Sequence, residues 1–266
     1  MTPTRLRTKY GPWALVTGAS DGIGLEIATQ LAQAGVNLAM VARRRERLEG
    51  LARELMDRHG IQTRVIAADL SDAAAVDAVN DATRDLEISL LVAAAGYGTS
   101  GAFADSRLPD ELSMIDLNCR AVVALSHHHA RIMRARGRGG IVLFSSLVAF
   151  QGVPRAATYA ATKAFVQSFA EALHAELAPH GVHVLASAPG PVRSGFGARA
   201  DMQMNAAVTP QEVATGTLAA LGRRVTVRPG FLSVALEAAL APLPRSLRVG
   251  IMARVMGGMT QHQARE

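Results

Sequence analysis

The sequence has one cysteine, few charged residues and no long apolar run near its start. The lone Cys119 excludes an intrachain disulfide and a cysteine-rich metal cluster. The polar segment Met1–Gly11 leads into an apolar run, Trp13–Val16, that is too short for a signal-peptide core or a membrane span. We therefore expect a cytoplasmic protein without a transmembrane segment.

The charge balance is basic. Charged residues make up 19% of the 266 residues and leave a formal net charge of +6, while 49% are hydrophobic, enough for one sizeable core. The densest basic groups, at 43–47 and 131–138, are not interleaved with the aromatic side chains on which single-strand binders stack bases. We interpret them as a solvated face and expect no nucleic-acid partner. A salt-dependent shift with arbitrary DNA is the observation that favours the alternative.

Apolar runs rich in Val, Leu, Ile and Ala recur along the chain, each followed by a longer segment with helical spacing. This alternation is typical of a parallel sheet that is covered by helices on both faces. It continues without a segment long enough to be an interdomain linker. We therefore predict one α/β, doubly wound Rossmann-type domain with a mostly parallel seven-stranded sheet. The predicted strands are Ala14–Thr17, Asn37–Ala42, Thr63–Ala67, Leu90–Ala93, Gly140–Ser145, His183–Ala188 and Arg224–Val227. The predicted helices are Ile23–Ala34, Arg45–His59, Ala73–Asp85, Pro109–Arg136, Thr158–Pro179 and Pro210–Leu221.

The pattern changes after Gly230 into a C-terminal helical extension, residues 229–266. It contains the apolar stretch Phe231–Ala241, then Pro242-Leu243-Pro244, then a stretch with Arg and Met. Such a segment either packs as part of the same domain or forms a partly mobile tail. Its apolar residues with interspersed Arg also suit a membrane-surface helix or a lid over a substrate, and these readings stay open.

A glycine-rich turn follows the first predicted strand, with the sequence Thr17-Gly18-Ala19-Ser20-Asp21-Gly22-Ile23-Gly24. Glycines permit a tight strand-to-helix turn and a close backbone approach to a pyrophosphate, while the amides of the helix N-terminus supply the positive end. A spaced glycine trio alone is equally a plain turn. Because this trio follows a strand and opens a helix, it predicts a dinucleotide site. The expected contacts are Gly18, Ser20, Gly22, Ile23 and Gly24.

The second strand ends at Ala42, where a protein that prefers NAD usually presents a carboxylate to the ribose hydroxyls. This chain presents Arg43 and Arg44 instead. A guanidinium pairs bidentately with a 2′-phosphate, so Arg43 predicts NADP(H) as the cofactor. The alternative is that both arginines are only the solvated start of the next helix.

Tyr159 and Lys163 are four residues apart on a predicted helix, so their side chains point the same way. A tyrosine titrates near pH 10, and a neighbouring ammonium is expected to lower its pKa toward a useful range for proton transfer. Ser146 follows the preceding strand at its carboxyl end, where its hydroxyl is able to hold a substrate oxygen. Taken alone, a Tyr-x-x-x-Lys pair is usually an ordinary helix face.

The motifs in combination resemble the short-chain dehydrogenase/reductase family: TGxxxGxG at 17–24, Ser146, Tyr159 with Lys163, and Pro189-Gly190, in this order. The resemblance covers roughly Trp13 to Val227. It implies that residues 1–228 form an NADP(H)-binding catalytic domain that interconverts a carbonyl and a secondary alcohol by hydride transfer.

The resemblance also implies roles for individual residues. Tyr159 would be the general acid in carbonyl reduction and the general base in alcohol oxidation. Lys163 would bond the nicotinamide ribose and lower the pKa of Tyr159, Ser146 would orient the reacting oxygen, and Asn118 would hold a water that links Lys163 to solvent.

Further positions match the family's cofactor contacts. Asp69 and Leu70 match the adenine contacts, and Ala95 supplies a backbone contact. Pro189 and Gly190 precede Val192 and Ser194, the pair that matches the carboxamide contacts and fixes the nicotinamide face.

Two positions depart from the family pattern. The run Ala93-Ala94-Ala95-Gly96 stands where the family has Asn-Asn-Ala-Gly, so asparagine bonds that steady the sheet must be absent or replaced. Asp21 stands where many NADP-using relatives carry a basic residue, and its charge opposes a phosphate.

The substrate pocket is expected among the loops Gly96–Ser106, Leu147–Ala157 and Val192–Val208, with the tail after Gly230 as a further candidate. Their apolar residues favour an apolar, acyl or steroid-like carbonyl. The family commonly pairs the helix Pro109–Arg136 and the Tyr159 helix across a dimer, so a homodimer or homotetramer is expected.

Two other features suggest sites that we do not expect. Adjacent residues of a helix point in different directions, so His127-His128-His129 is not expected to bind metal, and Cys119 fits a small core residue better than a nucleophile.

The alternative to an enzyme is a non-catalytic NADP(H)-binding sensor or scaffold, against which the complete set Asn118, Ser146, Tyr159 and Lys163 argues.

Overall fold

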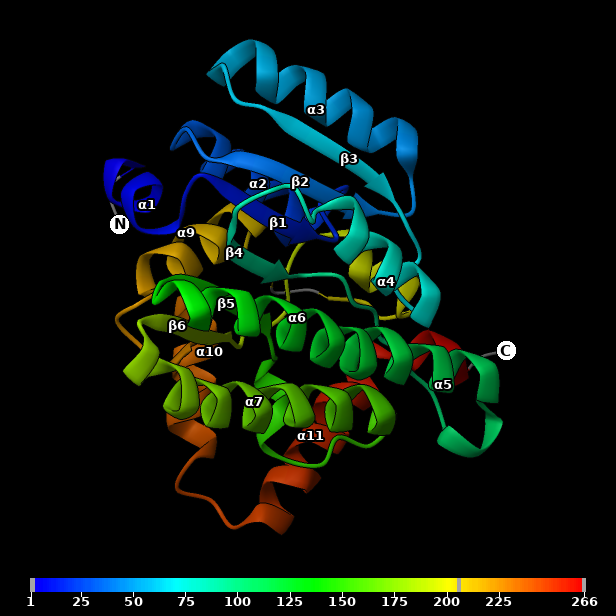
Figure 1. Cartoon of the computed structure of the whole chain (residues 1–266). Coiled ribbons are helices and arrows are strands. Elements are labelled where there is room, and N and C mark those ends of the chain that lie inside the picture. The colour runs from blue at the N-terminus through cyan, green and yellow to red at the C-terminus, as the bar shows by residue number, and fades with distance from the viewer. Residues whose placement is uncertain (1–2, 205–206, 265–266) are drawn as a thin grey trace.

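The computed structural model describes residues 3–204 and 207–264, so Asn205 and Ala206 of the expected pocket loop and the last two residues of the tail lie outside the described part. Seven strands form one parallel sheet in the order β3-β2-β1-β4-β5-β6-β7 (Figure 1). The predicted doubly wound α/β fold is confirmed. The strands are β1 (Trp13–Thr17), β2 (Asn37–Ala42), β3 (Thr63–Ala67), β4 (Ile88–Ala93), β5 (Gly139–Phe144), β6 (Val182–Ser187) and β7 (Thr226–Val227).

Helices cover both faces of the sheet. α1, α2, α3 and α9 pack on one face, and α4, α6 and α7 pack on the other. None of the described helices is long and apolar enough to cross a membrane. The helices are α1 (Pro3–Tyr10), α2 (Gly22–Gln33), α3 (Arg45–His59), α4 (Ala73–Ala82), α5 (Leu108–Ile115), α6 (Ala121–Arg136), α7 (Ala157–Leu177), α8 (Gly195–Arg199), α9 (Pro210–Ala220), α10 (Phe231–Leu240) and α11 (Arg245–Met259).

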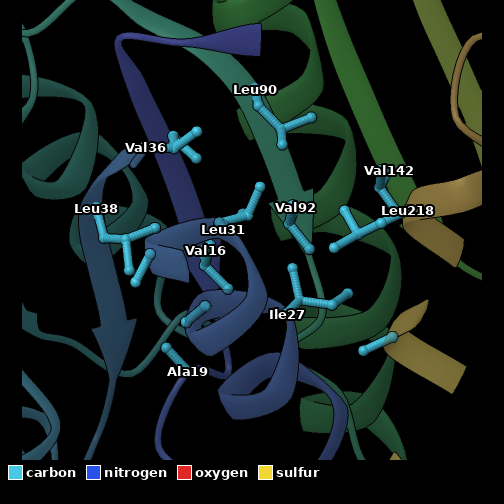
Figure 2. Packing of buried hydrophobic residues seen from close by; sticks show 14 of the residues in the cluster. Val16, Ala19, Ile27, Leu31, Val36, Leu38, Leu90, Val92, Val142 and Leu218 are labelled. Atoms are coloured by element: carbon cyan, nitrogen blue, oxygen red, sulfur yellow. The ribbon is translucent and has the colours of Figure 1, made fainter. Parts of the chain in front are cut away.

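The core beneath the glycine-rich turn is formed where α2 crosses β1 and β4. Figure 2 shows Ile27 and Leu31 of α2 pointing at Val16 and Val92 of these strands. All four side chains are fully buried. Because strands buried on both faces need apolar residues throughout, the continuous Val, Leu, Ile and Ala runs form them. This packing fixes where α2 begins and therefore where the turn lies.

The predicted long helix Pro109–Arg136 was wrong in its interior. The structure has α5, then a π-helical turn at Asp116–Arg120, then α6. The wider turn carries Asn118, and such single π-turns occur mostly at functional sites. The apolar periodicity of the segment did not reveal it, because the turn spans only five residues and helix continues on both sides of it.

Three short turns complete the connections between these elements. They are 3₁₀ helices at Phe103–Asp105, Leu147–Phe150 and Ala178–His180. The structure also adds α1, in a segment that the sequence marked only as polar. Elsewhere the observed strand and helix ends differ from the predicted ones by a few residues, as helix ends fray and strand ends lose pairing partners.

The described part of the C-terminal extension packs beside the start of α7. Met252 and Met256 of α11 are buried against Val153, Ala156 and Leu240. A further 3₁₀ turn follows α11 at Gln261–Ala264. The extension therefore lies against the segment that carries the predicted reactive tyrosine.

Replacing Leu31 with Ala is expected to lower the free energy of unfolding by about 2–5 kcal/mol, because it leaves a cavity under the glycine-rich turn. Urea unfolding followed by circular dichroism measures the change. Met56→Ala on α3 is the control, since 38% of the Met56 residue is exposed. Equal stability of the two variants would contradict this account of the core.

Candidate active site

A cavity of about 460 Å³ opens at the carboxyl ends of β1, β2 and β4. The glycines of the turn form its floor because no side chain fits there. A Cβ on Gly24 would lie 2.4 Å from the carbonyl oxygen of Gly18, and one on Gly18 would lie 2.9 Å from that of Ala94. Gly18 also has φ +68°, which favours glycine. This bare backbone cradle beside a helix N-terminus fits a dinucleotide pyrophosphate.

The expected cofactor contacts divide between two cavities. Those that line the first cavity are Gly18, Ser20, Gly22, Ile23, Gly24, Arg43, Asp69, Leu70, Ala95 and Ser194. Those that line a second, adjoining cavity are Tyr159, Lys163, Pro189, Gly190 and Val192. Ile23, Ala94, Gly96, Ser194 and Phe196 line both, so the two cavities meet along these residues.

Two arginines lie at the far end of the first cavity. Arg43 is 3.8 Å from a carboxylate oxygen of Asp69. Arg44 donates to the Ser20 hydroxyl at 3.2 Å and lies 3.5 Å from the Asp21 carboxylate. The charge of Asp21 was expected to oppose a phosphate at this end of the cavity. The contact with Arg44 offsets that negative charge and brings a second guanidinium to the turn.

Asp69 stays negatively charged at this end of the cavity. Burial acts to raise the pKa of its carboxyl, but hydrogen bonds from Ser71 and the charges of Arg43 and Arg199 outweigh burial and hold the pKa below its usual range. A carboxylate between two guanidiniums stays ionised, so Asp69 is available as a hydrogen-bond acceptor.

Arg199 is a residue of the first cavity that the sequence did not reveal. It lies at the end of α8, and its guanidinium is 4.1 Å from the centre of the Tyr97 ring. The Tyr97 hydroxyl donates to the carbonyl of Asp110 at 2.7 Å. Arginine on a loop after a Pro-Gly pair carries no spacing signal, so only the fold brings it here.

The second cavity measures about 220 Å³ and holds the predicted reactive residues. Ser146, Tyr159 and Lys163 all line it. Ser146 follows β5, whereas Tyr159 and Lys163 lie on the first turns of α7, so the end of the strand and the start of the helix meet at this cavity. The sequence prediction that these three residues come together agrees with this arrangement.

The expected lowering of the Tyr159 pKa by Lys163 is not seen, because burial dominates at that hydroxyl. Burial raises the pKa of the Tyr159 hydroxyl to about 12, against a smaller lowering by the hydrogen bond with Ser146. The Lys163 ammonium is 5.7 Å from the centre of the tyrosine ring, so its charge acts weakly there. Tyr159 therefore holds its proton at neutral pH.

Lys163 is buried beneath the tyrosine. Its Nζ donates to the carbonyl of Phe144 at 2.8 Å. Burial lowers the pKa of the ammonium from its usual 10.5 to about 8, because a charged group loses hydration in the interior. An ammonium with this pKa exchanges protons near neutral pH more readily than an exposed lysine.

Asn118 lies in the π-turn and is almost fully buried. Its side chain donates to the carbonyl of Tyr97 at 2.9 Å and to the Thr162 hydroxyl at 3.1 Å, and accepts from the Tyr97 amide at 3.2 Å. A Cβ on Gly96 would lie 2.9 Å from the Asn118 oxygen, so this approach requires glycine. Asn118 joins the loop after β4 to the helix that carries Tyr159.

The alanine run after β4 is steadied by a threonine of the glycine-rich turn. The Ala95 amide donates to the Thr17 hydroxyl at 3.0 Å. This bond joins the ends of β1 and β4 without an asparagine side chain. It is a replacement for the contacts that the family motif implied.

The remaining singled-out residues lie outside both cavities. His129 is buried, and burial lowers the pKa of its imidazole to about 3, so it stays neutral. Burial raises the pKa of the Cys119 thiol to about 11, which makes it a poor nucleophile. Among the described residues, no group of three His, Cys, Asp or Glu side chains is placed to hold a metal ion.

The C-terminal extension supplies residues to the second cavity that sequence patterns did not identify. Ser233 of α10 is buried, and its hydroxyl accepts from the Gly190 amide at 2.8 Å. Methionines form much of the apolar wall of this cavity, three of them from α11 and two from the segment after α8. They are Met202, Met204, Met252, Met256 and Met259. Of the readings that the sequence left open for the extension, packing as part of the same domain fits these contacts.

Comparisons with known proteins agree with this geometry. The family model described as short chain dehydrogenase matches residues 12–205. A 7beta-hydroxysteroid dehydrogenase of Collinsella aerofaciens is 31% identical over 238 residues, which cover 85% of this chain and 88% of that protein.

Two solved structures show the same arrangement. One, from work on the stereoselectivity of a 7beta-hydroxysteroid dehydrogenase, has a TM-score of 0.86 and 28% identity and covers 93% of this chain and 98% of that chain. The other is a short-chain dehydrogenase of Sphingobium yanoikuyae in complex with NADPH, with a TM-score of 0.81 and 32% identity, covering 91% and 95% of the two chains.

The low pKa of Lys163 predicts a pH-dependent stability. The folded protein binds fewer protons than the unfolded chain between about pH 8 and 10.5, so the contribution of Lys163 to the free energy of unfolding rises with pH across that window. We expect Lys163→Met to be more stable than wild type by up to about 3 kcal/mol near pH 7, with a gain that shrinks toward pH 10.

Urea unfolding at a series of pH values measures this difference. Arg53→Met is the control, because Arg53 is exposed and its replacement removes the same charge. A Lys163→Met variant that is no more stable than wild type near pH 7 would show that burial does not penalise the ammonium.

Proposed function

Because the chain belongs to the short-chain dehydrogenase family, we propose that it is an NADP(H)-dependent enzyme that interconverts a ketone and a secondary alcohol on a bulky apolar substrate. One observation carries the proposal. Ser146, Tyr159 and Lys163 line an apolar cavity that meets a glycine-floored nucleotide cavity along Gly96 and Ser194. NADPH in the first cavity would donate hydride next to the second cavity, where Tyr159 would donate the proton.

The proton chemistry in this proposal belongs to Ser146 and Tyr159. Bound NADPH supplies the hydride. The Ser146 hydroxyl orients the substrate oxygen, and the Tyr159 hydroxyl donates its proton to that oxygen as negative charge develops there. The raised pKa of Tyr159 keeps it in the protonated form that ketone reduction requires. In alcohol oxidation the phenolate would accept the proton, which demands a higher pH.

Lys163 is proposed to support the proton transfer. Its ammonium lies beneath the Tyr159 ring, held by the Phe144 carbonyl, and its positive charge favours the phenolate left after the proton has gone. With a pKa of about 8, the ammonium is also suited to pass a proton toward the tyrosine oxygen. Asn118 holds the loop after β4 in place against α7 through its hydrogen bonds to Tyr97 and Thr162.

Arg43 and Arg44 support NADP(H) over NAD(H). They are the basic side chains at the end of β2, on the side of the cavity away from Tyr159. Asp21 is already in contact with Arg44, so its carboxylate opposes a 2′-phosphate less than it would alone. The Sphingobium yanoikuyae relative is a complex with NADPH, which agrees with this choice.

The substrate class is proposed from the wall of the second cavity. Methionine, leucine, valine and phenylalanine side chains surround the reactive oxygen site, with few polar partners besides Ser146 and Tyr159. Such a wall binds hydrocarbon and orients it through one carbonyl. Relatives named 7beta-hydroxysteroid dehydrogenase, which align over most of their length, support a steroid-like ketone.

A non-catalytic sensor is the weaker alternative. Lys163 is buried at a cost to stability beside Ser146 and Tyr159, and a pure nucleotide-binding module need not keep this proton-transfer set. A charge kept at such a cost is typical of an active site.

Tyr159→Phe removes the proton donor and leaves the shape of both cavities nearly unchanged. Turnover of a ketone by NADPH is expected to fall about 10²–10⁴-fold, while the Kd for NADPH changes little. NADPH absorbance and calorimetry measure the two quantities. Tyr10→Phe is the control, because Tyr10 is buried in α1 against Gly140 and Gly222. Undiminished turnover in Tyr159→Phe would remove the tyrosine from the mechanism.

The double variant Arg43→Ala/Arg44→Ala tests the cofactor choice. Loss of charge-assisted hydrogen bonds to a 2′-phosphate should weaken NADPH binding at least about tenfold and leave NADH binding nearly unchanged. The double variant Arg47→Ala/Arg53→Ala provides a control with the same charge change on the exposed surface of α3. If wild type already binds NADH as tightly as NADPH, these arginines do not select the cofactor.

A further inference from the structure

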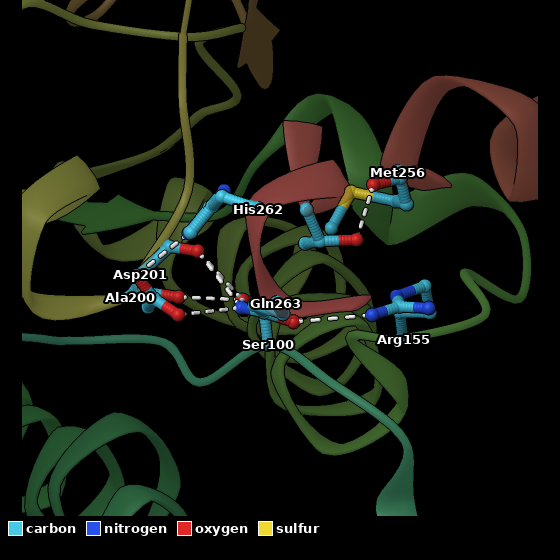
Figure 3. A network of polar contacts seen from close by, with 8 residues as sticks. Ser100, Arg155, Ala200, Asp201, Met256, His262 and Gln263 are labelled. Atoms are coloured by element: carbon cyan, nitrogen blue, oxygen red, sulfur yellow. Dashed lines mark hydrogen bonds and ion pairs between the residues drawn. The ribbon is translucent and has the colours of Figure 1, made fainter. Parts of the chain in front are cut away.

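The side chain of Gln263 joins three separate segments of the chain (Figure 3). Its Nε2 lies 2.8 Å from the Ser100 hydroxyl and 2.9 Å from the carbonyl oxygen of Asp201. The same nitrogen is 2.8 Å from the Asp201 carboxylate. Its Oε1 accepts from the Arg155 guanidinium at 3.2 Å. Every polar atom of the amide is therefore used.

A second contact supports the same junction. His262 Nε2 lies 2.8 Å from the other oxygen of the Asp201 carboxylate. The Ser100 hydroxyl donates to the carbonyl of Ala200 at 2.7 Å. We call the set Ser100, Arg155, Asp201, His262 and Gln263 the clasp.

Each segment held by the clasp also forms a wall of the second cavity. Ser100 follows Gly98, where a Cβ would lie 2.9 Å from Phe196 Cζ and 3.0 Å from Tyr159 Cδ2. Arg155 precedes α7, which carries Tyr159, and Asp201 follows α8, which carries Phe196. The two rings are 5.3 Å apart between centres. The clasp thus connects the C-terminus to the surroundings of the reactive tyrosine.

The backbone at two of these residues is unusual. Arg155 has φ 66° and Asp201 has φ 52°, both in the left-handed region that non-glycine residues seldom adopt. Such conformations persist where surrounding contacts hold them. Both residues bond to Gln263, so its amide is one of the contacts that hold them.

Two residues of the clasp, His262 and Gln263, follow α11, the helix that covers one side of the second cavity and is called its roof below. Met252, Met256 and Met259 of α11 line the cavity, and Thr260 bonds to the Met256 carbonyl at 2.8 Å. The Gln203 amide donates to the carbonyl of Met259 at 2.9 Å. Methionine side chains adapt to many shapes, so the position of α11 limits the cavity more than the rotamers do.

The closed cavity is small for the substrate class proposed above. Its volume is about 220 Å³, whereas sites for drug-sized ligands measure roughly 300–1,000 Å³. We propose that Gln263 is a positioning residue that sets substrate size: it holds α11 closed, so that small ketones fit and bulky ketones enter only when the clasp opens. This inference rests on the proposed reduction of ketones.

The variant Gln263→Ala tests the inference with two ketones, a 7-oxo steroid and cyclohexanone, at saturating NADPH. Without the hydrogen bonds of the Gln263 side-chain amide, α11 moves away from the cavity more easily. The value of kcat/KM for the steroid should therefore rise, and that for cyclohexanone should fall. The ratio of the two is expected to change about tenfold in favour of the steroid, mainly through KM. Gln261→Ala is the matched control, since Gln261 is exposed in the same turn.

A merely structural role for Gln263 predicts a different result. General loosening would lower kcat/KM for both ketones together, and a uniform fall or an unchanged ratio overturns the inference. If wild type reduces neither ketone, the proposed function fails on its own, and calorimetric binding of the two ketones to the NADPH-loaded protein then decides the size preference.

Hydrogen exchange gives a readout that is independent of turnover. In Gln263→Ala the amides of α11 should exchange faster than in wild type, while those of β5 should be unchanged, because only the clasp has opened. Equal exchange in α11 of wild type, Gln263→Ala and Gln261→Ala would show that Gln263 does not hold the roof.

Discussion

The parallel pairing of β1 with both β2 and β4 is the constraint on which the site depends. Thr17 is in register with Val41 on one side and Ala93 on the other, so three strands end together at one edge of the sheet. The connections from β1 and β4 leave in opposite directions, which opens a crevice between them. The crevice stays open to a ligand because Gly18 and Gly24 place bare backbone there. The same edge brings Ser146 and α7 beside it.

Burial is the dominant electrostatic effect in the reactive centre. It raises the pKa of Tyr159 and lowers that of Lys163, so it shifts each group toward its neutral form, although Lys163 with a pKa of about 8 stays mostly protonated at pH 7. The charge of Lys163 was expected to decide the state of the tyrosine, but desolvation outweighs it at this separation. Ser146 is the neighbour that favours the phenolate. A tyrosine that keeps its proton suits ketone reduction better than alcohol oxidation at neutral pH, and the buried lysine reduces stability for the sake of that chemistry.

Local patterns predicted the parts of the molecule whose cause is local. Apolar runs predicted the strands, because burial on both faces requires apolar side chains throughout. The glycines predicted the turn at Gly18, because a close backbone approach leaves no room for a side chain. Ser146, Tyr159 and Lys163 were found through the family's motif order, although no single spacing identified them. Gln263, Arg199 and the role of Thr17 were not predictable, because their partners Ser100, Tyr97 and Ala95 lie far away in sequence. The pKa of Tyr159 required knowledge of how deeply α7 packs, which helical spacing does not contain.

Transfer of hydride from nicotinamide to a ketone carbon is the central claim, and isotopic labelling tests it most directly. The protein is incubated with a 7-oxo steroid and NADPH that carries deuterium at both C4 positions of the nicotinamide, and the alcohol is examined by mass spectrometry. The account predicts an alcohol with deuterium on the carbinol carbon. An alcohol without deuterium, or no alcohol with any ketone of a broad panel, would contradict it.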